Sequence, residues 1–214
     1  MNVAAVRSSY IDAIQRGDRR TALRALDEAR ADGLDIRTLY EEVLQPAQCE
    51  IGQLWQENRI TVADEHLATA ITQAAMSRVY DELFRVEPRA GRTLIAACAD
   101  TERHELGLRM VCDLLELDGW DTCYLGATVP IESLVDIVRE RRPRAVALSA
   151  SIAPHLQRLQ SAITAMRETL GADTPLIIVG GRLFQDDPAL GQRIGADVTA
   201  RTAGEAVRLL EERT

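Results

Sequence analysis

The second half of the chain alternates short apolar runs with longer amphipathic segments, starting at Thr93. Short apolar runs are typical of buried strands, and the amphipathic stretches between them are typical of helices that cover a sheet. This alternation predicts an α/β fold with a doubly wound, flavodoxin-like or Rossmann-like parallel sheet of five strands. The predicted strands are Thr93–Ala99, Asp121–Leu125, Ala145–Ser149, Leu176–Val179 and Asp197–Ala200. The predicted helices are His104–Leu117, Ile131–Arg141, Pro154–Leu170, Pro188–Ile194 and Gly204–Glu212.

The first part of the chain, up to about Phe84, has apolar residues at the spacing of amphipathic helices. We expect an N-terminal four-helix bundle with short connections, in which Asp18 begins a helix and Gly33 ends it. A polar stretch containing Pro88 and Gly91 is typical of a linker. The chain therefore divides into a helical-bundle domain, residues 1–86, and an α/β domain, residues 92–214. The predicted helical segments are Ala22–Ala29, Leu34–Leu44, Ala47–Trp55 and Val62–Phe84.

The formal net charge of −8 argues against direct binding of nucleic acid, which depends on phosphate neutralisation by Lys and Arg. No apolar stretch is long enough to cross a bilayer, and the N-terminus lacks the apolar core of a secretory signal. The four cysteines, Cys49, Cys98, Cys112 and Cys123, form no C-x-x-C pair. We therefore expect buried thiols in a cytoplasmic protein rather than a zinc site.

Unusual loops follow the first four predicted strands. They are Glu102–Gly107, Gly126–Pro130, Ser149–Pro154 and the pair Gly180-Gly181. The carboxyl ends of parallel strands lie at one edge of a sheet, where such folds bind ligands. The placement of all four loops at that edge predicts a bound ligand.

His104 is the strongest single candidate for a ligand contact. Glu102, two residues earlier, can hold one ring nitrogen and direct the other towards a metal ion. Gly107 allows a large group to approach the backbone. Taken one at a time, these features have ordinary explanations: a histidine near a helix N-terminus, serines in a loop and a glycine turn after a strand.

The four loops together resemble the vitamin B12-binding domain of methionine synthases, corrinoid mutases and corrinoid carrier proteins. That family has D-x-H-x-x-G after the first strand, S-x-L after the third and G-G after the fourth. The resemblance covers about Arg92 to the C-terminus and implies a cobalamin-binding domain. Glutamate replaces the usual aspartate at position 102, and serine replaces the usual leucine at position 151. The matching residues are Glu102, His104 and Gly107, then Ser149 and Ser151, then Gly180 and Gly181.

The resemblance implies a role for each of these residues. His104 would replace the dimethylbenzimidazole of the cofactor as the lower cobalt ligand, with Glu102 as its hydrogen-bond acceptor. The displaced nucleotide tail would run into the sheet edge, where glycines admit it and small hydroxyls meet its polar groups. The implied contacts are Ser149, Ser151, Gly180 and Gly181 for the tail, and Gly126, Thr128 and Val129 for the corrin edge.

The helical part resembles the cap of the light-sensing adenosylcobalamin repressors of the CarH type. In that family a tryptophan, followed ten residues later by a Glu-His pair, covers the upper face of the corrin. Trp55, Glu65 and His66 repeat that order and spacing. The resemblance implies that the Trp55 indole shields an adenosyl group while Glu65 and His66 make polar contacts. The alternative is a core tryptophan and a surface Glu-His pair on an ordinary bundle.

Two features depart from the repressor pattern. We expect no DNA-binding region before the bundle, and Gln56 stands where the repressors have a histidine that captures cobalt after photolysis. Because Gln56 is a poor cobalt ligand, water or His66 would take that place. His155, the third histidine, is expected to be exposed rather than ligating.

Two classes of function fit these expectations. The first is an adenosylcobalamin sensor or photoreceptor, in which light or ligand moves the cap and changes self-association or binding to a partner such as a transcription factor. The alternative is a corrinoid methyl carrier of a methyltransferase system, for which methylcobalamin would be the bound form. A mutase subunit is a third class, in which the cap would be superfluous. Since the sequence has no catalytic constellation of its own, we expect a binding protein rather than an enzyme.

Overall fold

The computed structural model describes residues 1–83, 85–185, 187 and 189–213. The chain forms two compact units, Met1–Glu82 and Leu83–Thr214, and each is described by itself. Within the described residues, no helix is long and apolar enough to span a bilayer.

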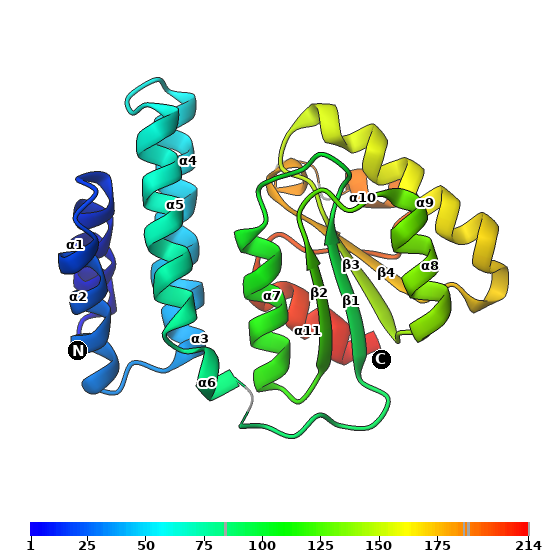
Figure 1. Cartoon of the computed structure of the whole chain (residues 1–214), viewed down its shortest axis with the longest axis horizontal. Helices are drawn as coiled ribbons and strands as arrows, with labels where there is room; N and C mark the ends of the chain where they lie inside the picture. The colour runs from blue at the N-terminus through cyan, green and yellow to red at the C-terminus, as the bar shows by residue number, and fades with distance from the viewer. Residues whose placement is uncertain (84, 186, 188, 214) are drawn as a thin grey trace. The chain divides into compact units, whose positions relative to one another are not determined.

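The first unit is a helical bundle (Figure 1). Its core is largely apolar, and within it the buried side chains of Tyr10 and Thr72 form a hydrogen bond of 2.9 Å. The first helix of the unit was not among the predicted segments, because alanines and serines weaken its apolar period. The helices are α1 (Val3–Gln15), α2 (Arg19–Ala31), α3 (Ile36–Thr38), the π-helical segment η1 (Leu39–Leu44), α4 (Gln45–Gln56), α5 (Val62–Ser77) and α6 (Tyr80–Leu83).

Residues 36–56 are helical without a break, so the prediction of two separate helices here is wrong. Pro46 has no N–H and would normally end a helix. Here the turn before it widens into η1, and the N–H of Gln45 donates to the carbonyl of Tyr40. The carbonyl of Glu42, four residues before Pro46, accepts instead from the Arg7 side chain at 3.2 Å. The arginine thus satisfies the group that the proline leaves without its helical donor.

Helix ends in this unit follow local capping rules. The Asp18 side chain accepts from the N–H of Thr21 at 3.1 Å, which confirms the predicted start of α2. Thr61 and Asp64 form a reciprocal capping box at the start of α5. The predicted helix Val62–Phe84 is wrong in length, since α5 ends at Ser77 and α6 follows. Its predicted end, Phe84, lies outside the described residues.

The second unit contains a parallel sheet with strand order β2-β1-β3-β4-β5. This is the flavodoxin-like order, and the predicted fold class is confirmed. β2 lies on one side of β1 and β3 on the other, so the order of the strands switches between β1 and β3. The carboxyl ends of these two strands are therefore the expected ligand site. The strands are β1 (Thr93–Cys98), β2 (Asp121–Gly126), β3 (Ala145–Ser149), β4 (Leu176–Gly180) and β5 (Val198–Thr199).

Helices cover both faces of the sheet (Figure 1). The helices α7 (Leu106–Leu117) and α11 (Ala203–Arg213) pack together on one face, and α8 (Ile131–Arg141) and α9 (Leu156–Leu170) on the other. A continuous apolar core fills the space between the sheet and α8 and α9. The remaining segments are η2 (Ala153–His155), η3 (Gly171–Asp173), η4 (Arg182–Phe184) and α10 (Ala189–Arg193).

Two predicted helix starts in this unit are wrong in a way that matters for the site. The first helix begins at Leu106, which leaves His104 in a loop, and α9 begins at Leu156 after a single turn of η2. The predicted start of the next helix, Pro188, lies outside the described residues. The expectation of buried thiols holds for Cys98 and Cys112 and is wrong for Cys49, which is exposed.

Candidate cobalamin site at the strand ends

Glu102, in the loop after β1, is fully buried and accepts five hydrogen bonds. Its Oε1 accepts from the N–H groups of Arg103 at 2.8 Å and His104 at 2.9 Å, and from His104 Nδ1 at 2.5 Å. Its Oε2 accepts from the N–H of Ser151 at 2.6 Å and from His155 Nδ1 at 2.8 Å. One carboxylate therefore ties together the loops after β1 and β3.

These contacts fix the charge state of Glu102. Burial by itself would raise the pKa of this carboxyl, because it disfavours the ionised form. The hydrogen bonds from His104, His155 and Ser151 outweigh burial and hold the pKa of Glu102 well below its usual range. The carboxylate is thus ionised at neutral pH and accepts from every donor around it.

His104 has the geometry of a directed metal ligand. The expected hydrogen bond to Glu102 is present at its Nδ1, which makes Nε2 the nitrogen suited to coordination. The side chain is 45% exposed, so a bound group can reach the ring. Glu102 Oε1 also accepts a hydrogen bond from the backbone N–H of His104, and His104 lies in the loop that precedes α7.

His155 is the functional residue that the sequence reasoning missed. Its side chain is only 13% exposed, so the expectation of an exposed histidine is wrong. It reaches the buried carboxylate from η2, 53 positions along the chain from Glu102. The second oxygen of Glu102 thus has a histidine of its own, and any movement of Glu102 must disturb both imidazoles.

The loops after β3 and β4 meet beside Glu102. Ser149 is buried at the end of β3, and the N–H of the next residue, Ala150, donates to the carbonyl of Gly180 at 3.1 Å. Ser151 contributes its backbone N–H to Glu102. The structure therefore brings the predicted residues Ser149, Ser151 and Gly180 to one edge of the sheet.

Gly181 is the position in this edge that most strictly requires glycine. Its φ is +104°, which an L side chain rarely adopts. A Cβ here would also collide with the carbonyl oxygen of Ala150, and it would lie 3.0 Å from Ser149 Oγ. Gly107 differs, since a Cβ there would meet nothing within 4 Å.

The segment after β2 lies on the other side of Glu102. The register of β2 against β1 shifts just before Gly126, which has a φ of +75° and is buried. Thr128 is exposed, and its N–H donates to the carbonyl of Glu102 at 3.2 Å. Val129 is half-buried against the core under α8. These three predicted residues thus border the same loop as His104.

Tyr124 in β2 and Cys98 at the end of β1 lie on the strands that lead into these loops. The Tyr124 hydroxyl is buried and has no hydrogen-bond partner among the described residues. Burial, reinforced by the charge of Glu105, raises the pKa of Tyr124 above its usual range. Burial and the charges of Glu102 and Glu105 raise the pKa of the Cys98 thiol to about 12. Burial therefore favours the protonated form of both groups.

The helical unit holds the remaining predicted residues. Trp55, near the end of α4, is half-buried. Glu65 and His66 occupy adjacent positions on α5, with Glu65 Oε2 and His66 Nδ1 2.5 Å apart. The His66 side chain is 75% exposed, whereas that of Glu65 is only 18% exposed. The pair therefore presents an accessible imidazole beside a carboxylate that is held against the bundle.

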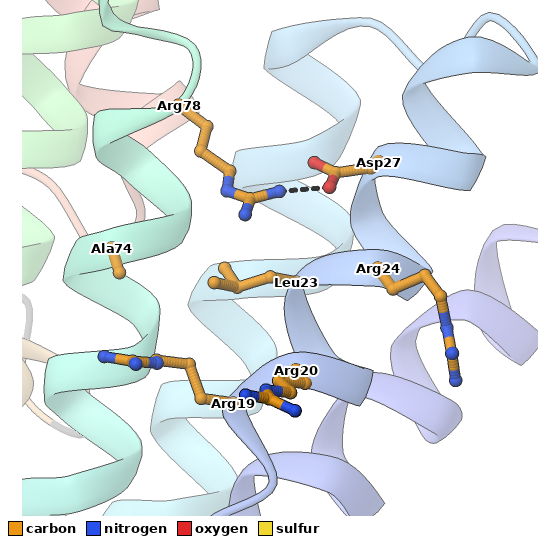
Figure 2. A pocket seen from close by; sticks show the side chains of 7 residues that line it. All are labelled: Arg19, Arg20, Leu23, Arg24, Asp27, Ala74 and Arg78. Atoms are coloured by element: carbon orange, nitrogen blue, oxygen red, sulfur yellow. Dashed lines mark hydrogen bonds and ion pairs between the residues drawn. The ribbon is translucent and has the colours of Figure 1, made fainter.

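A separate groove of about 520 Å³ lies between α2 and α5 (Figure 2). Leu23 and Ala74 supply its apolar lining, and Arg78 forms an ion pair with Asp27. Its other charged residues are Arg19, Arg20 and Arg24. The groove is thus positively charged and contains none of the residues expected to contact cobalamin.

Two family models match the chain, and both are described as B12 binding domains. One covers residues 6–80 and the other residues 92–211. A solved structure of the monomethylamine corrinoid protein of Methanosarcina barkeri superposes with a TM-score of 0.88, covers 100% of both chains and is 21% identical.

Curated relatives fall into two groups. The HTH-type transcriptional repressor CarH of Myxococcus xanthus is 30% identical over 90% of this chain and 62% of its own length. The HTH-type transcriptional repressor CarA of the same organism is 32% identical over 74% of this chain and 51% of its own length. Trimethylamine corrinoid protein 1 of Methanosarcina acetivorans is 24% identical, over 92% of this chain and 91% of its own length. The chain thus spans less than two thirds of the repressors it matches.

Proposed function

Since this chain belongs to the B12-binding domain family and binds cobalamin, we propose that it is a regulatory module that senses adenosylcobalamin or light. In this proposal His104 is the lower cobalt ligand, and Trp55, Glu65 and His66 contact the adenosyl side. Light or ligand exchange then changes the cap and, through it, self-association or a protein partner such as a transcription factor.

The observation that carries the cofactor assignment is the Glu102–His104 pair. A buried, ionised carboxylate fixes the imidazole through Nδ1, while the ring stays 45% exposed. The surroundings also fit a corrinoid. Open space lies beside Gly107, where a Cβ would meet nothing within 4 Å. Cobalamin, when bound, supplies a photolabile cobalt–carbon bond.

The chain's own residues supply binding and control. Glu102 holds the imidazole against rotation, since it also binds the backbone N–H of the same residue. Ser149 and Ser151 offer hydroxyl groups for the polar parts of the tail. Trp55 offers a large apolar ring that excludes water, and Glu65 offers an acceptor for the hydroxyl and amino groups of an adenosyl ligand.

The second candidate function is a corrinoid methyl carrier. It is favoured by the similarity to trimethylamine corrinoid protein 1 of Methanosarcina acetivorans, which is 24% identical over 92% of this chain. In that case separate methyltransferases would be the partners, and the bound form would be methylcobalamin. The Glu65-His66 pair favours the sensor, because two polar groups suit an adenosyl ligand better than a methyl group.

One experiment separates the two functions. The protein is reconstituted in the dark with adenosylcobalamin or methylcobalamin, and absorption spectra and sizing elution are recorded before and after green light. The sensor predicts a base-off, histidine-ligated spectrum and an elution volume that changes on illumination. Preference for methylcobalamin with no change in size would favour the carrier, and His104→Ala provides the control for site-specific binding.

A further inference from the structure

A chain of hydrogen bonds leads from Glu65 into the core of the helical bundle. Glu65 Oε1 lies 2.9 Å from the Thr69 hydroxyl, and that hydroxyl lies 3.1 Å from Gln48 Oε1. Gln48 Nε2 donates to Thr72 Oγ1 at 2.6 Å, and Thr72 Oγ1 lies 2.9 Å from the Tyr10 hydroxyl. Three helices, α1, α4 and α5, thus share one polar network.

The inner end of this network fixes the direction of the Gln48 amide. The Thr72 hydroxyl donates its single proton to the carbonyl of Ala68 at 3.1 Å. It must therefore accept from both Tyr10 and Gln48. Tyr10 and Thr72 are both fully buried, so water does not replace either partner. With its NH₂ group committed to Thr72, Gln48 presents its carbonyl oxygen to Thr69.

Thr69 therefore faces two acceptors with one proton. An ionised carboxylate and an amide oxygen only accept hydrogen bonds, so Glu65 and Gln48 compete for the same hydroxyl hydrogen. The charged acceptor forms the stronger bond, and Glu65 is accordingly favoured at rest. If Glu65 turns away, the Thr69 hydroxyl rotates and donates its hydrogen bond to Gln48 instead.

We infer that Gln48 is a positioning residue for Glu65, because it takes over the Thr69 proton when Glu65 turns to the adenosyl group of cobalamin. This inference rests on the proposed function, in which Glu65 contacts that group. Without Gln48, the movement of Glu65 would leave a half-buried hydroxyl without an acceptor. The loss of one neutral hydrogen bond, about 1 kcal/mol, corresponds to about fivefold weaker binding of adenosylcobalamin.

The test is a double-mutant cycle on the full chain. Gln48→Met keeps the length of the side chain and removes the acceptor, and it should weaken adenosylcobalamin binding about fivefold. Methylcobalamin binding should not change, because that ligand has no adenosyl group for Glu65 to contact. In the Thr69→Val background, Gln48→Met should have no further effect, since no hydroxyl needs an acceptor. Thr69→Ser should behave as the wild type.

An equal effect of Gln48→Met in both backgrounds, or an equal loss of both cobalamins, would overturn the inference. A second readout needs no cofactor: the ¹³C shift of the Gln48 side-chain carbonyl. Glu65→Ala leaves the Thr69 proton to Gln48 and Thr69→Val removes it, so the two variants should move this shift in opposite directions. Shifts in the same direction would also overturn the inference.

Failure of the proposed function has a different signature. If Glu65→Ala leaves the preference for adenosylcobalamin over methylcobalamin unchanged, Glu65 does not contact the adenosyl group. Failure confined to the Gln48 variants would remove the role of Gln48 and leave the contact of Glu65 in place.

Discussion

Replacement of Glu102 by glutamine tests the centre of the site with almost no change in shape. The amide has one acceptor oxygen and one NH₂ group, whereas the five groups around Glu102 are all donors. The better orientation keeps the oxygen towards His104 and turns the NH₂ group towards Ser151 and His155. The N–H of Ser151 then faces another donor, and His155 must change its tautomer.

The expected loss of unfolding free energy follows from these contacts. Hydrogen bonds to a charged group contribute about 1.5–3 kcal/mol and neutral ones about 1 kcal/mol, so the three retained bonds lose about 1 kcal/mol each. The unpaired N–H of Ser151 adds about 1–3 kcal/mol. Relief from burying an ionised carboxylate offsets several kcal/mol of this. We therefore expect Glu102→Gln to destabilise the second unit by about 2–4 kcal/mol at pH 7.

The difference in unfolding free energy between the wild type and Glu102→Gln should also depend on pH. The pKa of Glu102 is lowered in the folded protein, so its stabilising contribution is present above the pKa of an unfolded carboxyl, about 4.3, and is lost as the pH falls towards the folded value. The wild type should therefore lose its advantage over Glu102→Gln below about pH 4.

Denaturant unfolding followed by tryptophan fluorescence measures this difference. Trp120 is fully buried in the second unit and donates from Nε1 to Glu211 at 2.7 Å, and a Trp55→Phe background removes the signal of the other unit. Glu140→Gln, at an exposed position on α8, is the matched control and should change stability little. A loss that is below about 1 kcal/mol, or that is the same at pH 7 and pH 3, would refute the role assigned to the ionised carboxylate.

Three further outcomes are expected. His104→Ala should abolish or greatly weaken cobalamin binding without loss of the fold, and an unchanged absorption spectrum of the bound cofactor would exclude His104 as the ligand. Trp55→Ala should leave cobalamin bound but change the rate of photolysis and any light-dependent change in elution volume; if both stay identical, Trp55 does not cover the upper face. Gly107→Ala, where a Cβ meets nothing, should leave the denaturation midpoint unchanged yet weaken cobalamin binding, whereas Gly181→Ala should lower the midpoint itself because of its collision with Ala150.

The sheet could be predicted from the sequence because its central strands, β1, β3 and β4, are largely buried and consist of short apolar runs. β3 was predicted with its observed bounds, and β1 to within one residue. Glu102 and His104 could be paired in advance, since they are two residues apart and their contact is local. Continuity of the helix through Pro46 could not be predicted, because it depends on Arg7, 35 residues away from Glu42.

His155 was missed for the same physical reason. Its partner lies 53 positions away, and a histidine at the start of a helix gives no sign of a buried carboxylate opposite it. The only available signal was topological: η2 follows β3, and β3 is the sheet neighbour of β1, which ends just before Glu102. Pairing polar residues across neighbouring strand ends would have brought the two together.

The span of the contacts around Glu102 also has a consequence for folding. Two of its donors, Ser151 and His155, come from positions 49 and 53 residues further along the chain, beyond α7, β2, α8 and β3. The contact between Glu102 Oε1 and His104 is local, but Oε2 gains its two donors only after β1 and β3 have paired, which fixes the carboxylate that orients His104. A histidine-ligated cobalamin spectrum would then appear late in refolding, and saturation with the cofactor at 100 times its dissociation constant would stabilise the second unit by about 2.7 kcal/mol. The appearance of that spectrum would therefore mark the completion of folding in the second unit.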